Sequence, residues 1–334
     1  MRIAVIGGGI VGLTTALELK RELRNANITI FASDFDDTVS HVAAGIFRIG
    51  SSYFGPSEEI TRKWINDSYE YYNDIRKSAE AGVAGVTNIS GYIFANSGPN
   101  AVKNKWMEGL VPIYRAATDD EFNIVGGDWK YGAFFTTLLT QCSLHLPWAR
   151  QKLREDGVSL ITRKIDSLSE FGEENPLIIN CTGIGARELC DDRRLVPIRG
   201  QVIKVKAPWI KNCFYGELDT YIIPGHYGIC TLGGSRSFDS VFSGICQHEN
   251  RAIRERCETL LPSLSKAKTV AYATGLRPHR EGNVRVEPEK LTGYSGTIVV
   301  HNYGHGGYGV CTAPGTAKYA VQLTKEIHRS TSKL

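Results

Sequence analysis

The chain has 334 residues, of which 42% are hydrophobic and 22% charged, and its formal net charge is +4. These proportions are those of an ordinary globular protein, and the mild charge without a Lys/Arg block excludes nucleic acid as an expected partner. No apolar run approaches the roughly 20 residues of a membrane-spanning helix, so we expect no membrane partner. The length suits one large domain or two interlocked domains.

The first informative stretch joins an apolar run to a glycine-rich turn. Residues 3–6 are all apolar, which is typical of a strand covered on both faces, and Gly7, Gly9 and Gly12 follow at the G-x-G-x-x-G spacing. A helix pattern comes next, and Asp34 stands about 20 residues further on, after a second apolar run. A strand, three glycines and a helix, with an acid at this distance, predict a dinucleotide site with phosphates at the helix N-terminus.

The middle of the chain changes character twice. Residues 58–80 have helix periodicity, and short β-like runs then alternate with loops over 84–135. This departs from a βα pattern and indicates a second, antiparallel domain inserted into the first. Residues 146–156 predict a helix and 177–183 a buried strand that ends in small polar residues, before strand-like alternation returns over 199–275.

Near its end the chain repeats the strand, glycine loop and helix pattern. A strand over 297–300 leads into a glycine-rich loop over 301–309, and a helix follows to about residue 327. Two such turns at opposite ends of the chain suggest that both ends close on one large ligand. FAD suits that arrangement better than NAD, because its bulky ring system must be held as well as its pyrophosphate.

The cysteines and the last three residues indicate the compartment of the cell in which we expect the protein. Eight cysteines are scattered without a C-x-x-C pair, which indicates reduced, mostly buried thiols in an intracellular protein. The last three residues, Ser332-Lys333-Leu334, match the peroxisomal address. We therefore expect a peroxisomal matrix protein whose partners include the peroxisomal import receptor.

The chain resembles the D-amino-acid oxidase family, and within it the D-aspartate oxidase branch. The matching motifs run in the family's order through the whole chain: Val5 to Leu13, Val42-Ala43-Ala44-Gly45, Asn180 to Gly183, Arg199-Gly200-Gln201, Tyr221 to Gly225, Thr231 to Gly234, Gly275-Leu276-Arg277-Pro278 and His301 to Gly309. Residues 79–85 and the Leu146-Pro147-Trp148 run favour the aspartate branch.

The resemblance implies an α/β fold: a Rossmann-like FAD-binding domain of the glutathione-reductase type, with an inserted, mainly antiparallel β-sheet substrate domain. The FAD domain would be discontinuous and comprise residues 1–50, 140–198 and 278–334. The substrate domain would comprise residues 51–139 and 199–277.

The resemblance also implies noncovalent FAD. The residues expected to bind it are Gly7, Gly8, Gly9, Ile10, Val11, Gly12, Ser33, Asp34, Ser40, Ala44, Gly45, Ile46, Ile165, Thr182, Gly183, Gly275, Arg277, Gly306, Gly307, Tyr308, Gly309, Val310 and Cys311. Ser33 stands where the family places an acid and Asp34 comes next, so either residue could contact the ribose. A tryptophan usual in the family is replaced by the run Cys311-Thr312-Ala313-Pro314, whose proline suits the first turn of a helix.

Three residues match the family's amino-acid-binding positions. Arg277 would bind the substrate α-carboxylate, since a guanidinium makes two parallel charge-assisted hydrogen bonds in a fixed plane. Tyr221 would share that carboxylate, and the backbone carbonyl of Gly307 would take the amine. A hydride mechanism leaves little for a base to do, so we expect no acid/base residue. His305 then serves packing or flavin contact, and His301 is structural.

Two further arginines bear on the substrate class. A second substrate carboxylate needs a second cation, and Arg236 stands where the aspartate branch places its side-chain-binding arginine, while Arg48 falls close to the flavin. Surface salt bridges are the alternative role for both. Glu217 replaces a second tyrosine that family members with neutral substrates carry, which argues against a tyrosine lid.

The expected activity is FAD-dependent oxidation of D-aspartate or D-glutamate by O2, giving a 2-oxo acid, ammonia and hydrogen peroxide. Hydride transfer from Cα to flavin N5 would be the chemical step. An oxidase of neutral D-amino acids with the same fold is the first alternative, and a catalytically silent FAD-binding protein is the second. No metal is expected.

Overall fold

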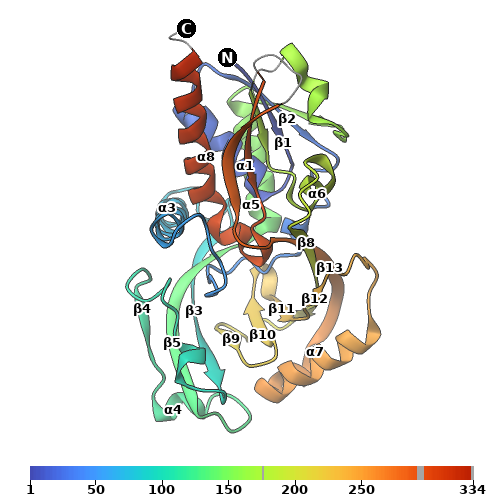
Figure 1. The fold of residues 1–334 in the computed structure, drawn as a ribbon. Helices are drawn as coiled ribbons and strands as arrows, with labels where there is room; N and C mark the ends of the chain where they lie inside the picture. Colours follow the sequence, from blue (N-terminus) through green and yellow to red (C-terminus); the bar gives the residue numbers. More distant parts are fainter. Residues whose placement is uncertain (175–176, 292–296, 332–334) are drawn as a thin grey trace.

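The computed structural model describes residues 1–174, 177–291 and 297–331. Two β-sheets dominate the fold, one in the upper half of Figure 1 and one in the lower half. Within the described residues, no helix combines the length and apolar character needed to cross a bilayer. The expected Ser332-Lys333-Leu334 signal lies outside the described residues, so peroxisomal targeting stays a prediction of the sequence.

The first sheet contains the predicted dinucleotide strand at its centre. Its strands, counted over the described residues, run in the order β14-β15-β7-β1-β2-β6. They are β1 (Arg2–Ile6), β2 (Asn27–Ala32), β6 (Ser159–Thr162), β7 (Leu177–Asn180), β14 (Arg285–Lys290) and β15 (Ile298–Tyr303). All pairs are parallel except that of β14 with β15. The carboxyl ends of β1, β7 and β15 therefore meet at one edge, where ligands bind in sheets of this kind.

Both faces of the first sheet are covered, which explains the continuous apolar run of β1. Ile3 and Val5 belong to the main core, on the side of α1 (Ile10–Glu22), α5 (Cys142–Glu155) and α8 (Gly309–Thr331). Ala4 and Ile6 pack into a separate cluster on the opposite face with Phe171. Alternate residues of one strand thus reach two different cores, and no polar position is needed between them.

Helix α8 packs along α3 (Glu58–Lys77), although α3 falls within the range 51–139 expected for the second domain. Pro314 is not in the first turn of α8, as the sequence suggested, but in its second turn. Proline has no N–H to donate to the Val310 carbonyl, and the Tyr72 hydroxyl of α3 donates to that carbonyl at 2.7 Å instead. The next N–H, that of Gly315, donates to Ser68 Oγ at 2.8 Å. Two α3 side chains therefore replace helix bonds that the proline disrupts.

The second sheet is mainly antiparallel, as predicted, and its path among the described strands is β12-β8-β11-β10-β9-β3-β5-β4, with β13 also paired to β8. These strands are β3 (Val86–Ala95), β4 (Ile113–Ala116), β5 (Tyr131–Thr140), β8 (Leu195–Lys206), β9 (Cys213–Tyr215), β10 (Tyr221–Pro224), β11 (Ile229–Gly233), β12 (Ser237–Phe238) and β13 (Lys268–Arg280). The parallel pairing of β3 with β9 is the exception.

The first part of the range 84–135 differs in detail from the expected alternation of short β-like runs with loops. One continuous strand, β3, passes through Gly91 instead of breaking there. A Cβ at Gly91 would overlap the backbone and sulfur of Cys213 in the neighbouring strand β9. The glycine therefore permits close approach of two strands and does not mark a turn.

A long helix packs against the second sheet. Helix α7 (Gln247–Leu260) packs against β8 and β11 and buries Ile253, Cys257 and Leu260 in a second core. The short helices are α2 (Val39–Val42), α4 (Asp119–Phe122) and α6 (Ala186–Leu189). The eight cysteines all fall in the described part of the chain and carry free thiols.

Candidate active site

A cavity of about 1280 Å³ lies where the edge of the first sheet meets the second sheet. Its walls include the turn after β1, the loop after β15 and one side of β13. Of the residues expected to bind FAD or substrate, Gly12 alone does not line it. A Cβ at Gly12 would overlap the Gly7 carbonyl oxygen, so this glycine permits the helix to pack on the turn.

The turn before α1 forms a cradle of backbone. Gly7 has a φ of +126°, and a Cβ there would overlap the carbonyl of Cys181, the residue that follows β7. A Cβ at Gly9 would lie 3.2 Å from Ser40 Oγ, and that hydroxyl accepts a hydrogen bond from the Ile10 N–H at 3.1 Å. The start of a 13-residue helix, with glycines that leave its N–H groups accessible, suits a pyrophosphate.

Ser33 and Asp34 both line the cavity just after β2. Asp34 Oδ1 accepts the backbone N–H groups of Asp36 at 2.6 Å and Asp37 at 2.9 Å, and these bonds hold the pKa of its carboxyl below its usual range. One carboxylate oxygen of Asp34 is thus used by its own turn. The choice between Ser33 and Asp34 as ribose ligand stays open.

The expected carboxylate clamp forms on β13 and β10. A Cβ at Gly200, on the paired strand β8, would overlap the Arg277 guanidinium, so that group lies flat over the glycine. Arg277 Nη1 donates to the Ser235 carbonyl at 3.1 Å. Tyr221 lies beside the same guanidinium; burial raises the pKa of its hydroxyl and the charge of Arg277 opposes that rise. The phenol therefore keeps its proton near neutral pH and can donate it in a hydrogen bond.

Arg48 and Arg236 both line the cavity with Arg277, but in different surroundings. The Arg48 guanidinium lies 4.4 Å from the centre of the Tyr215 ring, and its Nε is buried without a hydrogen-bond partner among the described residues. Arg236 is 47% exposed and its Nη2 donates to Asp219 Oδ1 at 3.0 Å. Arg236 therefore forms a half-exposed salt bridge, the alternative role expected for it, although within the cavity lining. Arg48 forms no ion pair among the described residues, so the alternative role is not seen for it.

Hydrogen bonds hold side chains of the loop after β15 and of the first turn of α8. His305 Nε2 lies 3.0 Å from Thr316 Oγ1, and burial lowers the pKa of His305 to about 3. Cys311 Sγ donates to the Ile46 carbonyl at 3.1 Å, and Thr312 Oγ1 donates to the Tyr308 carbonyl at 2.8 Å. A neutral, hydrogen-bonded imidazole fits the packing role expected of His305 better than that of a general base.

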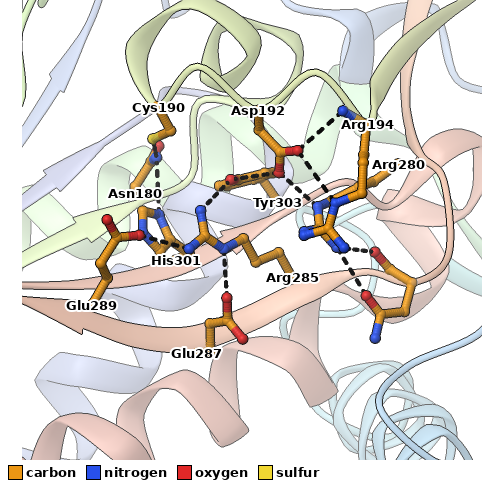
Figure 2. A network of polar contacts seen from close by, with 11 residues as sticks. Asn180, Cys190, Asp192, Arg194, Arg280, Arg285, Glu287, Glu289, His301 and Tyr303 are labelled. Carbon is orange, nitrogen blue, oxygen red and sulfur yellow. Dashed lines mark hydrogen bonds and ion pairs between the residues drawn. The ribbon is translucent and has the colours of Figure 1, made fainter.

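A polar network with a buried ion pair at its centre connects strands of the two sheets (Figure 2). Arg280, three residues after Arg277, donates to Asp192 at 2.7 Å, and both side chains are nearly inaccessible to solvent. The Tyr303 hydroxyl donates to the same carboxylate at 3.0 Å. His301 contacts Asn180 and Glu289, and burial lowers its pKa to about 4, consistent with a structural role. The network joins β13, β15 and the segment that leads into β8.

Two acidic residues, Glu217 and Asp219, line the cavity. Sequence reasoning missed Asp219 altogether and did not predict the contacts of Glu217. Glu217 Oε1 accepts the backbone N–H groups of Asn96 at 2.9 Å and Ser97 at 2.8 Å, which ties the end of β3 to the cavity. The family pattern singles out the position of Glu217 but not its contacts, and no motif marks Asp219, because both residues contact neighbours distant in sequence.

The comparisons with known proteins agree with this geometry. The FAD dependent oxidoreductase family (DAO) matches residues 2–323. The chain belongs to the D-amino-acid oxidase family of FAD-dependent oxidoreductases. It is 36% identical to human D-aspartate oxidase, over 97% of this chain and 95% of that one. It is 33% identical to the D-amino-acid oxidase of Streptomyces coelicolor, over 96% of each.

Solved structures show the same fold at lower identity. Glycine oxidase from Geobacillus kaustophilus superposes with a TM-score of 0.80 at 17% identity, covering 97% of this chain and 95% of that one. As a member of the D-amino-acid oxidase family, the chain uses FAD, and the cavity fits that cofactor. The glycine cradle and α1 N-terminus would hold the pyrophosphate, and the wall between Ala44 and the loop after β15 would hold the ring system.

Proposed function

We propose that this member of the D-amino-acid oxidase family oxidises acidic D-amino acids, D-aspartate and D-glutamate. With O2 and water, each would give a 2-oxo acid, ammonia and hydrogen peroxide. The observation that carries the proposal is that two cations, Arg48 and Arg236, line the same cavity as the expected α-carboxylate clamp Arg277.

The chain's own contribution is positioning. Arg277 and Tyr221 bind the substrate α-carboxylate, which fixes the orientation of Cα, and the Gly307 carbonyl accepts the amine N–H. FAD, when bound, supplies the acceptor for the hydride that leaves Cα. With a pKa of about 3, His305 is too weak a base to take a proton from the amine, so the amine loses its proton to solvent before the reaction.

A second carboxylate in the substrate requires compensation when it leaves water. The buried Nε of Arg48 lacks a hydrogen-bond partner among the described residues. A buried N–H donor without an acceptor costs free energy, which a ligand that supplies an acceptor would recover. Arg236 offers its remaining N–H groups at the half-exposed end of the site. Both features favour a substrate with an anionic side chain.

A neutral D-amino-acid oxidase is the second candidate, and one observation favours it. Arg236 already contacts Asp219, so a neutral substrate side chain would not leave this guanidinium without a partner. The relatives include both named activities, D-aspartate oxidase and D-amino-acid oxidase.

The deciding experiment measures hydrogen peroxide from D-aspartate, D-glutamate, D-alanine, D-methionine and L-aspartate. In the wild type, kcat/KM should be highest for the two acidic D-amino acids, and L-aspartate should be inert. Arg236→Leu should lower kcat/KM for D-aspartate about tenfold while sparing D-alanine. Arg187→Leu removes an arginine from a surface ion pair with Asp239 outside the cavity lining, and serves as the matched control.

Two results would refute the proposal in different ways. A wild type that prefers D-alanine, or an Arg236→Leu variant that loses both activities equally, favours the neutral oxidase. Bound flavin without peroxide from any D-amino acid favours a catalytically silent FAD-binding protein.

A further inference from the structure

The ion pair between Arg236 and Asp219 lies in the half-exposed part of the cavity lining. Both residues line the cavity, and their side chains are 47% and 42% exposed. Among the residues that the structure describes, Asp219 is the hydrogen-bond partner of Arg236, through Nη2 at 3.0 Å. A carboxylate from the chain itself therefore accepts from a guanidinium that the proposed function assigns to a substrate's second carboxylate.

The turn that carries Asp219 has an unusual backbone. Leu218 and Asp219 have φ values of 56° and 57°, in the left-handed region that Asp and Asn tolerate better than most residues. The Thr220 N–H donates to the Glu217 carbonyl at 3.1 Å, which closes the turn. This conformation directs the turn to the cavity mouth.

One side chain of α7 fixes the two halves of the ion pair relative to each other. Arg256 Nε donates to Thr220 Oγ1 at 3.2 Å, next to Asp219 in the chain. Arg256 Nη2 donates to the Gly234 carbonyl at 2.8 Å, two residues before Arg236. The segments that carry the acid and the base are thus bonded to the same guanidinium.

The same segment is tied to the α-carboxylate clamp. Arg277 donates to the carbonyl of Ser235, the residue that precedes Arg236. The Arg277 guanidinium is therefore bonded to the residue next to Arg236, and both arginines line the same cavity.

We propose that Asp219 is a specificity-determining residue that neutralises Arg236 whenever no acidic side chain is bound. This inference rests on the proposed function. When a neutral substrate binds, Arg236 stays paired with Asp219, so binding of that substrate is not weakened by a guanidinium without a partner. An acidic substrate has to compete with Asp219 for the same N–H groups. Both effects reduce discrimination between acidic and neutral D-amino acids.

The test compares D-aspartate with its neutral near-isostere D-asparagine in the FAD-loaded enzyme. Asp219→Asn keeps the side-chain shape and the tolerance for positive φ but removes the charge. It should raise kcat/KM for D-aspartate about two- to fivefold, the range of a half-exposed ion pair. It should lower kcat/KM for D-asparagine, because Arg236 then meets a neutral side chain without its carboxylate partner. The matched control is Asp239→Asn, which also has a positive φ of 55° and an ion pair, with Arg187, but does not line the cavity.

The double variant Asp219→Asn/Arg236→Leu isolates the coupling, because the gain for D-aspartate should vanish when Arg236 is absent. An unchanged or lowered kcat/KM for D-aspartate in Asp219→Asn would overturn the inference, as would an equal change for both substrates. If Arg236→Leu lowers D-aspartate activity while Asp219→Asn has no effect, the inference alone fails. If Arg236→Leu leaves the D-aspartate to D-asparagine ratio unchanged, the proposed function fails first.

Discussion

The guanidinium of Arg277 lies directly over Gly200 on the paired strand, where any Cβ would overlap both of its terminal nitrogens. Arg277 pairs with Ile198, and Gly200 lies two residues further along the same strand. Because Gly200 has no side chain, the guanidinium can lie over it. Gly200→Ala should displace the guanidinium and lower kcat/KM for every D-amino acid by at least tenfold, with FAD still bound.

Gly82→Ala is the control for that substitution, since a Cβ at Gly82 meets no atom within 4 Å. The measurement is steady-state kinetics together with the absorbance of bound flavin. Wild-type kinetics in Gly200→Ala would show that the clamp tolerates a methyl group and that the guanidinium can bind substrate from another position.

Removing the guanidinium itself tests whether Arg277 both binds the substrate and orients it. In Arg277→Ala, KM should rise and kcat should fall together, because the α-carboxylate contact also orients Cα. A charged hydrogen bond of this type contributes about 1.5–3 kcal/mol, so kcat/KM should fall at least tenfold. An Arg277→Ala enzyme that works near the wild-type rate would remove Arg277 from the site.

Cofactor binding should depend on Gly9. A Cβ there would already lie 3.2 Å from Ser40 Oγ, and the two methyl groups of valine would extend into the space expected for the pyrophosphate. Gly9→Val should lose noncovalent FAD, as measured by flavin absorbance after gel filtration, whereas acid precipitation of the wild type should release its flavin. Full flavin occupancy in Gly9→Val would contradict this assignment of the cradle.

The features that the sequence predicted are those written in local patterns. The strand, glycine turn and helix of residues 3–22 and the second glycine loop of 301–309 are each contiguous, and their backbone requirements are visible in composition alone. Arg277 could be placed because it lies within a family motif. Gly200 belongs to another motif, but its contact with Arg277 depends on strand pairing and could not be inferred.

Other features depend on partners that a linear pattern does not specify. Pro314 can lie in the second turn of α8 because Tyr72 and Ser68 of α3 complete the hydrogen bonds. Asp219 gives Arg236 an ion-pair partner that no sequence motif indicates. Only the tertiary fold brings these residues together.

The buried ion pair of Asp192 with Arg280 should matter for stability (Figure 2). Asp192→Asn would leave the Arg280 charge buried without its carboxylate, which typically costs about 3–5 kcal/mol. Urea unfolding of the FAD-loaded protein should show a loss of this order. Asp166→Asn, which breaks an exposed pair with Lys164, is the control and should change the free energy of unfolding by less than about 1 kcal/mol. Equal effects of the two substitutions would contradict the special role of the buried pair.

Three buried histidines predict how stability depends on pH. Burial lowers the pKa of His145 to about 4, that of His301 to about 4 and that of His305 to about 3. In the unfolded chain each would titrate near 6.5, so below that pH the unfolded state binds protons that the native state does not. The free energy of unfolding should therefore fall as pH drops from about 6.5 toward 4, and these groups should have no effect above pH 7.5.

Each histidine can contribute a slope of at most about 1.4 kcal/mol per pH unit. Burial also raises the pKa of the Glu18 carboxyl, so a histidine variant is needed to assign the slope. Urea midpoints of the FAD-loaded protein are therefore measured at pH 7.5, 6.0 and 5.0, with FAD held in constant excess, in the wild type and in His145→Gln. His145→Gln should flatten the slope by about one proton even if it also lowers stability at every pH, because the slope counts only protons taken up on unfolding. Equal stability at pH 7.5 and 5.0 in the wild type, or an unchanged slope in His145→Gln, would show that these imidazoles can be protonated within the folded protein.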